Sequence, residues 1–436
     1  MNNKLQKSLG ELVDAGVIPA ETAQRIQAYY QSRKSSSANI ITIVFSIIGA
    51  ALVGLGIILV IAHNWDHLSR GIKTTIAFLP LISGQLACAY TLLRKKDQPA
   101  WSEGSATFLF LAIGASISMV SQIYNIEGTL SGFLFTWMLL GLPLVYVMKS
   151  SMASLLYISG ITYYAVESGY FQYSDNNSYW YWLLLLLIIP HIFLLLKNKP
   201  GSNFTIINNW IISASLIISL GTIANDAEQL LFPAYMSLFA FFYLSGDIFF
   251  SQERKLFTNP YKLIGSTATI CLMMVFSFHW FWDDLNNDDW QHEIWQTPEF
   301  IATLLLSLAA GVLLLLSYLK KRDGDINPVE FTFLIFLFTY FFVSPSSSLF
   351  AMIIMNLLIL YCGIYWIRSG AKQDHFGILN YGLMIILILT CCRFFDDYLS
   401  FIIRGFLFVG AGLLFFAANY SQLRKRKNQF KTDSHD

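Results

Sequence analysis

Charged residues are scarce in this sequence. Lysine, arginine, aspartate and glutamate together make up 13% of its 436 residues, whereas soluble domains contain about 25%. Hydrophobic residues reach 55%, and the mean hydropathy is +0.54. A soluble fold of this composition would expose more apolar surface than its core could bury. The low charge therefore excludes an ordinary soluble domain, and we expect an integral membrane protein surrounded by membrane lipids.

Cysteine is also rare, and its placement excludes a disulfide framework. The chain has five cysteines, an odd number, and all of them lie in apolar stretches: Cys88, Cys271, Cys362, Cys391 and Cys392. Disulfide-rich domains instead carry even sets of cysteines in short secreted chains. We interpret these cysteines as small hydrophobic residues inside a helix bundle.

Long apolar runs take up most of the chain. A transmembrane helix requires about 20 predominantly apolar residues, and a helix satisfies all its backbone hydrogen bonds within one segment. We therefore expect an all-α fold, a polytopic bundle of about 14 transmembrane helices. The predicted spans are 39–62, 73–93, 104–124, 130–147, 152–167, 180–196, 205–224, 230–250, 262–282, 299–319, 327–343, 345–366, 375–393 and 398–420.

The basic residues predict the orientation of these spans. If the N-terminus is cytoplasmic, 24 of the 28 lysines and arginines fall in cytoplasmic loops or tails, which is the pattern of the positive-inside rule. The other four are Arg70, Lys73, Arg393 and Arg404. We expect both termini to be cytoplasmic and the outer loops to be acidic. The net charge of +1 is divided among separate loops, so we expect no nucleic-acid partner.

The predicted domains are a cytoplasmic helical hairpin and linker at 1–38, the transmembrane bundle at 39–420 and a basic cytoplasmic tail at 421–436. In the hairpin, Gly16 suits the end of a first helix and Pro19 the start of a second. About 30 residues cannot bury a core of their own, so the hairpin would dock on the bundle, pair with another copy or bind a protein partner. Its polar start does not resemble a cleavable signal peptide, and we expect the first apolar run to be an uncleaved anchor.

Three short patterns resemble a known family. The first is the spacing of Leu9, Val13, Gly16 and Ile18. The other two are the sequence His-Asn-Trp at 63–65 and the sequence Gln-Ile-Tyr-Asn at 122–125. Over roughly residues 1–150, the chain resembles bacterial predicted membrane proteins grouped as domain of unknown function 2157. The resemblance implies a bacterial cytoplasmic membrane and implies no activity.

Two places offer candidate metal ligands. His63 and His67 are four residues apart, so both would point the same way on a helix. Asp284 and Asp288 occupy two of the first three ligand positions of a calcium-binding loop. The remainder of that loop does not match, because residue 289 is aspartate rather than glycine and residue 295 is tryptophan rather than glutamate. The alternatives are a capping role for the histidines and a solubilising role for the aspartates.

No catalytic signature is complete. A zinc-protease pattern starts at His292-Glu293, but Gln296 stands where the second histidine should be. We therefore expect no enzyme activity and no cofactor. In the same outer loop, Trp282 and Trp290 could bind a sugar or a lipid headgroup together with the neighbouring carboxylates. The alternative is that they belong to the aromatic belt at the membrane interface.

Arg404 is the main candidate binding residue. It lies six residues inside the last predicted span, where an arginine is costly unless it is paired or reaches the interface. Glu167 and Asp397 are its candidate partners, and Gln122 is a further polar residue inside a span. Such residues could form a polar pocket for an anionic substrate.

Two functional hypotheses follow. The first is a transporter-like, multi-pass inner-membrane protein with an outer polar pocket for a small solute or a lipid component. The alternative is a membrane scaffold that recruits a partner through the hairpin or the acidic, aromatic outer loop.

Overall fold

The fold was obtained as a computed structural model, which describes residues 15–32, 65–171, 179–198, 201–225, 227–249, 259–286, 294–320 and 327–394. Single positions near the two ends are also described: 9, 12, 13, 402, 404–406, 408–410, 412, 413 and 416. The chain forms two compact units, residues 1–78 and 79–436. All regular elements in these described ranges are helices, which confirms the predicted all-α fold.

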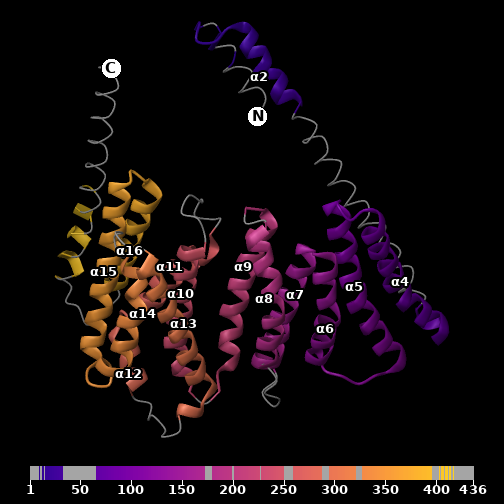
Figure 1. Ribbon diagram of the computed structural model, residues 1–436. Helices are drawn as coiled ribbons and strands as arrows, with labels where there is room; N and C mark the ends of the chain where they lie inside the picture. Colours follow the sequence, from indigo (N-terminus) through magenta and orange to yellow (C-terminus); the bar gives the residue numbers. More distant parts are fainter. Residues whose placement is uncertain are drawn as a thin grey trace. The chain divides into compact units, whose positions relative to one another are not determined.

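The N-terminal unit contains the helix α2 (Ala20–Ser32), shown in Figure 1. The helical turn before it ends at Gly16, whose φ of +67° lies in the left-handed region that glycine adopts without strain. The N–H of Gly16 donates to Val13 O and the N–H of Val17 donates to Leu12 O, both at 3.0 Å. These two bonds form a Schellman motif. Gly16 and Pro19 thus have the positions that the sequence predicts for them.

The helices that follow match the predicted apolar runs between residues 73 and 393. Several runs contain a short additional helix, such as the π-turns η2 (Glu167–Phe171) and η8 (Thr339–Val343). The helices are α4 (Arg70–Arg94), α5 (Pro99–Tyr124), α6 (Leu130–Met148), α7 (Ser151–Val166), α8 (Trp180–Asn198), α9 (Asn203–Leu220), α10 (Leu231–Phe249), α11 (Pro260–Val275), α12 (His279–Asn286), α13 (Pro298–Lys320), α14 (Pro328–Phe338), α15 (Ser348–Lys372) and α16 (Phe376–Phe394).

The predicted number of about 14 spans is not confirmed. Among the described residues, nine helices are long and apolar enough to cross a membrane, or ten if α11 and α12 together make one bent span. The predicted run 39–62 lies outside the described residues, and the run 398–420 is described only in part. The segment 328–343 is helical and apolar but shorter than the nine.

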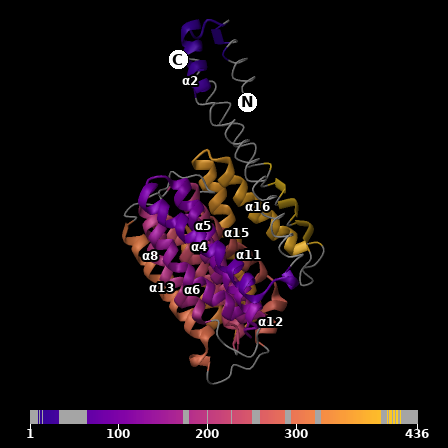
Figure 2. The same ribbon diagram turned by 90° about the vertical axis from the view of Figure 1, so that its right-hand side faces the viewer.

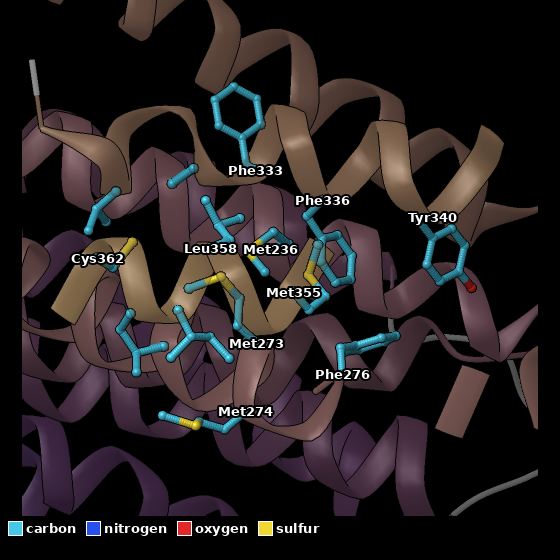
Figure 3. Close-up of a cluster of buried hydrophobic side chains, with 14 of the residues drawn as sticks. Met236, Met273, Met274, Phe276, Phe333, Phe336, Tyr340, Met355, Leu358 and Cys362 are labelled. Atoms are coloured by element: carbon cyan, nitrogen blue, oxygen red, sulfur yellow. The ribbon is translucent and has the colours of Figure 1, made fainter. Parts of the chain in front are cut away.

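The larger unit has two main buried clusters of apolar side chains. One is formed by α4 to α9, and the other by α10 to α16. Figure 3 shows part of the second cluster, in which Met236, Met273 and Met355 gather beside Phe336. Methionine side chains are unbranched and flexible, so they fill the irregular space between helices that do not pack in one regular layer.

Helices α15 and α16 lie side by side, as both ribbon views show (Figures 1 and 2). Gly382 of α16 permits this close approach. A Cβ atom there would lie 2.7 Å from Gly363 O and 2.7 Å from Ile367 N, both backbone atoms of α15. Real Cβ atoms do not approach backbone atoms so closely, so any larger residue would push the two helices apart.

We expect Gly382→Ala to lower the free energy of unfolding by about 1–3 kcal/mol, because the added methyl group overpacks this contact. Gly311→Ala in α13 is the matched control. A Cβ atom at Gly311 has nothing within 4 Å, so alanine should raise stability by about 0.5–1 kcal/mol through its higher helix propensity. Denaturant unfolding of the purified protein in detergent measures both changes. Equal effects of the two substitutions would contradict the close contact.

Candidate functional site

The helix that the sequence predicts at 262–282 is broken in the structure. α11 ends at Val275, and α12 begins at His279 with its axis turned by 82°. Ser277 contributes to the break, because its hydroxyl donates to Met274 O at 2.6 Å. Serine side chains that bond to nearby backbone carbonyls compete with regular helix geometry. We call residues 276–278 the α11–α12 break.

Two carbonyl groups of the break accept hydrogen bonds from side chains. Trp282 Nε1 donates to Phe276 O at 2.8 Å, and Asn356 Nδ2 of α15 donates to Ser277 O at 2.9 Å. Backbone groups without partners cost several kcal/mol in a membrane interior, and irregular backbone is tolerated where protein surrounds it. The hydrogen bonds from Trp282 and Asn356 therefore stabilise the break inside the bundle.

Trp282 stabilises this bend from inside the protein. Its side chain is 0% exposed, and its ring centroid lies 4.8 Å from that of Phe276. Trp280, two residues earlier, is 55% exposed. The sequence offered Trp282 as a ligand-binding or interfacial residue, whereas the structure places its side chain in the core and leaves Trp280 at the surface.

Arg393 approaches the break from the last turn of α16. Its side chain is 7% exposed, and Nη2 donates to Ser277 Oγ at 2.9 Å. Its guanidinium carbon also lies 4.6 Å from the ring centroid of Phe278, which is a cation–π contact. The sequence assigned Arg393 only to the outer side. The observation that it is buried and bonded to a broken helix comes from the structure alone.

Arg404 lies at the same end of α16. Its Nη1 donates to the carbonyl oxygen of Phe394 at 2.9 Å, and Phe394 is the residue after Arg393. The ring of Phe408 packs against Phe394 with centroids 5.5 Å apart. Carbonyl groups at a helix C-terminus attract cations because they are the negative end of the helix dipole. Two arginines therefore lie at the C-terminal end of α16. Arg393 is in its last turn and donates to Ser277 of the break, and Arg404 donates to Phe394 O.

A third polar pair lies on α12 itself. His279 Nδ1 and Asp283 Oδ2 are 2.6 Å apart, one helical turn from each other. The histidine is mostly buried, and 42% of the aspartate side chain is exposed. This end of the bundle thus carries one buried and one half-buried arginine, and carboxylate groups at its surface.

The other predicted binding residues lie in several places. Gln122 is exposed in the last turn of α5, and Glu167 is half-buried at the start of η2. Gln122 is on a helix of the first buried cluster and Glu167 directly follows α7, another helix of that cluster, whereas Arg404 contacts α16. Asp397 and Trp290 lie outside the described residues. The pairing of Arg404 with Glu167 or Asp397 therefore stays a prediction.

The predicted metal ligands are only partly described. His67 is exposed in η1 (Trp65–His67), and Asp284 is exposed on α12, while His63 and Asp288 lie outside the described residues. Within the described ranges, no group of three histidine, cysteine or acidic side chains is placed to hold a metal ion. The two predicted metal sites stay predictions.

Comparison with known proteins identifies one family. The family model described as "Predicted membrane protein (DUF2157)" matches residues 10–154, which confirms the resemblance predicted over about the first 150 residues. No curated protein and no solved structure matches the chain. The chain is thus a membrane protein with several apolar helices, similar to this family in its first third. The α11–α12 break and both arginines lie outside the matched residues.

Proposed function

We propose that this protein is a multi-pass, transporter-like protein of the bacterial inner membrane that binds a small anionic solute or an anionic lipid headgroup. The observation that carries the proposal is the position of Arg393 and Arg404 at one end of α16, with Arg393 bonded to Ser277 of the α11–α12 break. Transporters build substrate sites from interrupted helices in the same way.

The chemistry of arginine supports an anionic ligand. A guanidinium group has five N–H donors in a rigid, planar arrangement, so it can hold a carbonyl oxygen and a carboxylate or phosphate at once. Arg393 is only 7% exposed and lies against the ring of Phe278, and charge interactions are stronger in such a buried position than in water. A buried arginine in a membrane protein is costly and usually has a functional role.

The distribution of basic residues supports an outward-facing site. Lysines follow or end α4, α6, α13 and α15, all at the end of the helices opposite to Arg393: Lys95, Lys149, Lys320 and Lys372. By the positive-inside rule, that end faces the cytoplasm. In this proposal, both termini are cytoplasmic and the α11–α12 break faces the outer leaflet.

Arg404→Ala tests the proposal. Inorganic phosphate at ten times its dissociation constant should stabilise the wild-type protein by about 1.4 kcal/mol, and Arg404→Ala should abolish most of this gain. Arg404 is half-buried at the bundle edge, so the variant should fold. The readout is thermal unfolding in detergent at several phosphate concentrations. The same assay in nanodiscs with and without phosphatidylglycerol distinguishes a free anion from a headgroup.

Lys320→Ala is the matched control, because it removes one exposed cation from the opposite end of the bundle. It should keep the full phosphate response. If phosphate stabilises Arg404→Ala as much as the wild type, the proposed anion site is contradicted. That result would favour the alternative function, in which the protein is a scaffold that recruits a protein partner through the N-terminal hairpin. Val17 of the hairpin is an apolar residue with 65% of its surface exposed, so a partner could contact it.

A further inference from the structure

The C-terminal half of α16 carries a continuous, exposed apolar face. Its exposed residues recur at spacings of three and four, which places them on one side of the helix. We call them the α16 face: Met384, Leu387, Ile388, Cys391 and Phe394. Ile385 and Leu389, which alternate with them in the sequence, are buried in the second apolar cluster. In a membrane, the acyl chains of lipids lie against such an exposed face.

The α16 face has the length of the hydrocarbon layer of one leaflet. Met384 is 10 residues before Phe394, which corresponds to about 15 Å along a helix. The hydrocarbon core of a bilayer is about 30 Å thick, so each leaflet supplies about half of that thickness. A lipid whose headgroup is level with Phe394 would therefore lie along the whole face and reach the centre of the bilayer.

The positive charge is at the end of this face where the headgroup would be. Arg404 Nη1 donates to Phe394 O at 2.9 Å, and Phe394 is both the last residue of α16 and the last residue of the face. Arg393 is in the same helical turn and adds a second guanidinium group. Guanidinium groups form strong, charge-assisted hydrogen bonds with phosphate. The face and the two arginines thus match the two parts of a phospholipid.

The surroundings of Arg404 favour a lipid over a water-soluble anion. Ile402 and Phe406, on either side of it in the chain, are largely exposed. The ring of Phe408, which packs against Phe394, is exposed as well. A site open to water would leave these apolar side chains in water, which costs about 25 cal/mol for each Å² of apolar surface. A bound lipid covers them with its own chains.

We propose that the ligand of this site is an anionic phospholipid, whose phosphate lies beside Arg404 and whose acyl chain lies along the α16 face. This inference rests on the proposed function and narrows it from two sources of an anionic group to one. In the orientation proposed above, the protein takes its ligand from the outer leaflet of the membrane. Inorganic phosphate then acts at the site as a mimic of the headgroup.

Photocrosslinking with matched lipids tests this in the full-length protein. The protein is reconstituted in phosphatidylcholine vesicles with a trace of phosphatidylglycerol or of phosphatidylcholine, each carrying the same photoreactive group in its acyl chain. Mass spectrometry then compares labelling of the α16 face with labelling of α13, which has an exposed apolar face at a similar depth: Leu304, Leu305 and Leu308. The ratio of phosphatidylglycerol to phosphatidylcholine labelling should be about 5-fold higher on α16, since each arginine near an anionic headgroup contributes about this factor.

Arg404→Ala should reduce the labelling ratio of the α16 face to that of α13. Arg70→Ala is the matched control and should keep the wild-type ratio. Arg70 is an exposed cation at the start of α4, on the same side of the membrane as Arg404 in the proposed orientation.

Equal ratios on α16 and α13 in the wild type would overturn the proposal, and this comparison does not depend on the folding of any variant. An unchanged ratio in Arg404→Ala would overturn it as well. The phosphate titration of the wild type separates this inference from the proposed function. Stabilisation by phosphate without a lipid preference would refute the lipid and keep the anion site, whereas the absence of both effects would refute both.

Discussion

Trp282→Ala should lower the free energy of unfolding by about 3–5 kcal/mol, the range for removal of a fully buried aromatic side chain. Its indole packs against Phe276 and is 0% exposed. The substitution also removes the N–H that bonds to Phe276 O, at a point where α11 has ended. An unpaired carbonyl in a low-dielectric interior adds about 1–3 kcal/mol to the cost. The α11–α12 break should therefore be the part of the bundle most sensitive to this change.

Trp280→Ala is the control for this prediction. The two tryptophans are on the same short helix, but Trp280 is 55% exposed. Its replacement should change the free energy of unfolding by less than about 1 kcal/mol. Denaturant titration followed by circular dichroism measures both variants without relying on tryptophan fluorescence. If Trp280→Ala were the more destabilising change, α12 would be turned the other way and the description of the break would be wrong.

Arg393→Ala should weaken phosphate binding about 10- to 100-fold, because hydrogen bonds to charged groups contribute about 1.5–3 kcal/mol each. The expected loss exceeds that of Arg404→Ala because Arg393 is only 7% exposed. Charges interact more strongly around the buried Arg393 than around Arg404, which is half-buried at the edge of the bundle. Arg393→Ala should also reduce stability, since it removes the donor to Ser277 Oγ. Phosphate titration followed by thermal unfolding gives the binding constant and the stability of each variant.

Arg393→Lys distinguishes binding from packing. Lysine keeps the charge but loses the planar set of donors that suits phosphate and carboxylate. The expected result is a partial loss of affinity with a smaller loss of stability. A purely structural Arg393 would give the opposite pattern, in which Arg393→Ala is unstable but binds phosphate with unchanged affinity.

The sequence predicted the helices well where a long apolar run decides the structure. α5, α6 and α16 lie within a few residues of the runs 104–124, 130–147 and 375–393. The break at 276–278 was not predicted, because hydropathy continues across it and the bend depends on partners from α15 and α16. No local pattern encodes contacts with residues about 80 to 120 positions later in the chain.

The candidate site was predicted only in part for a related reason. Arg404 stood out because it interrupts an apolar run, whereas Arg393 lies at the end of a run, where charged residues are common. A sequence does not show whether an end residue points to water or into the bundle. Asp247 shows the same limit. It lies near the end of a predicted run, and the structure pairs it with Lys262 of α11 at 2.6 Å.

Calorimetric titration of inorganic phosphate into the purified protein tests the anion site most directly. The wild type should bind phosphate saturably at one site, and the double variant Arg393→Ala, Arg404→Ala should not bind it, while Lys320→Ala should bind it like the wild type. Equal binding by the wild type and the double variant, or no binding by the wild type, would contradict an anion site at the end of α16.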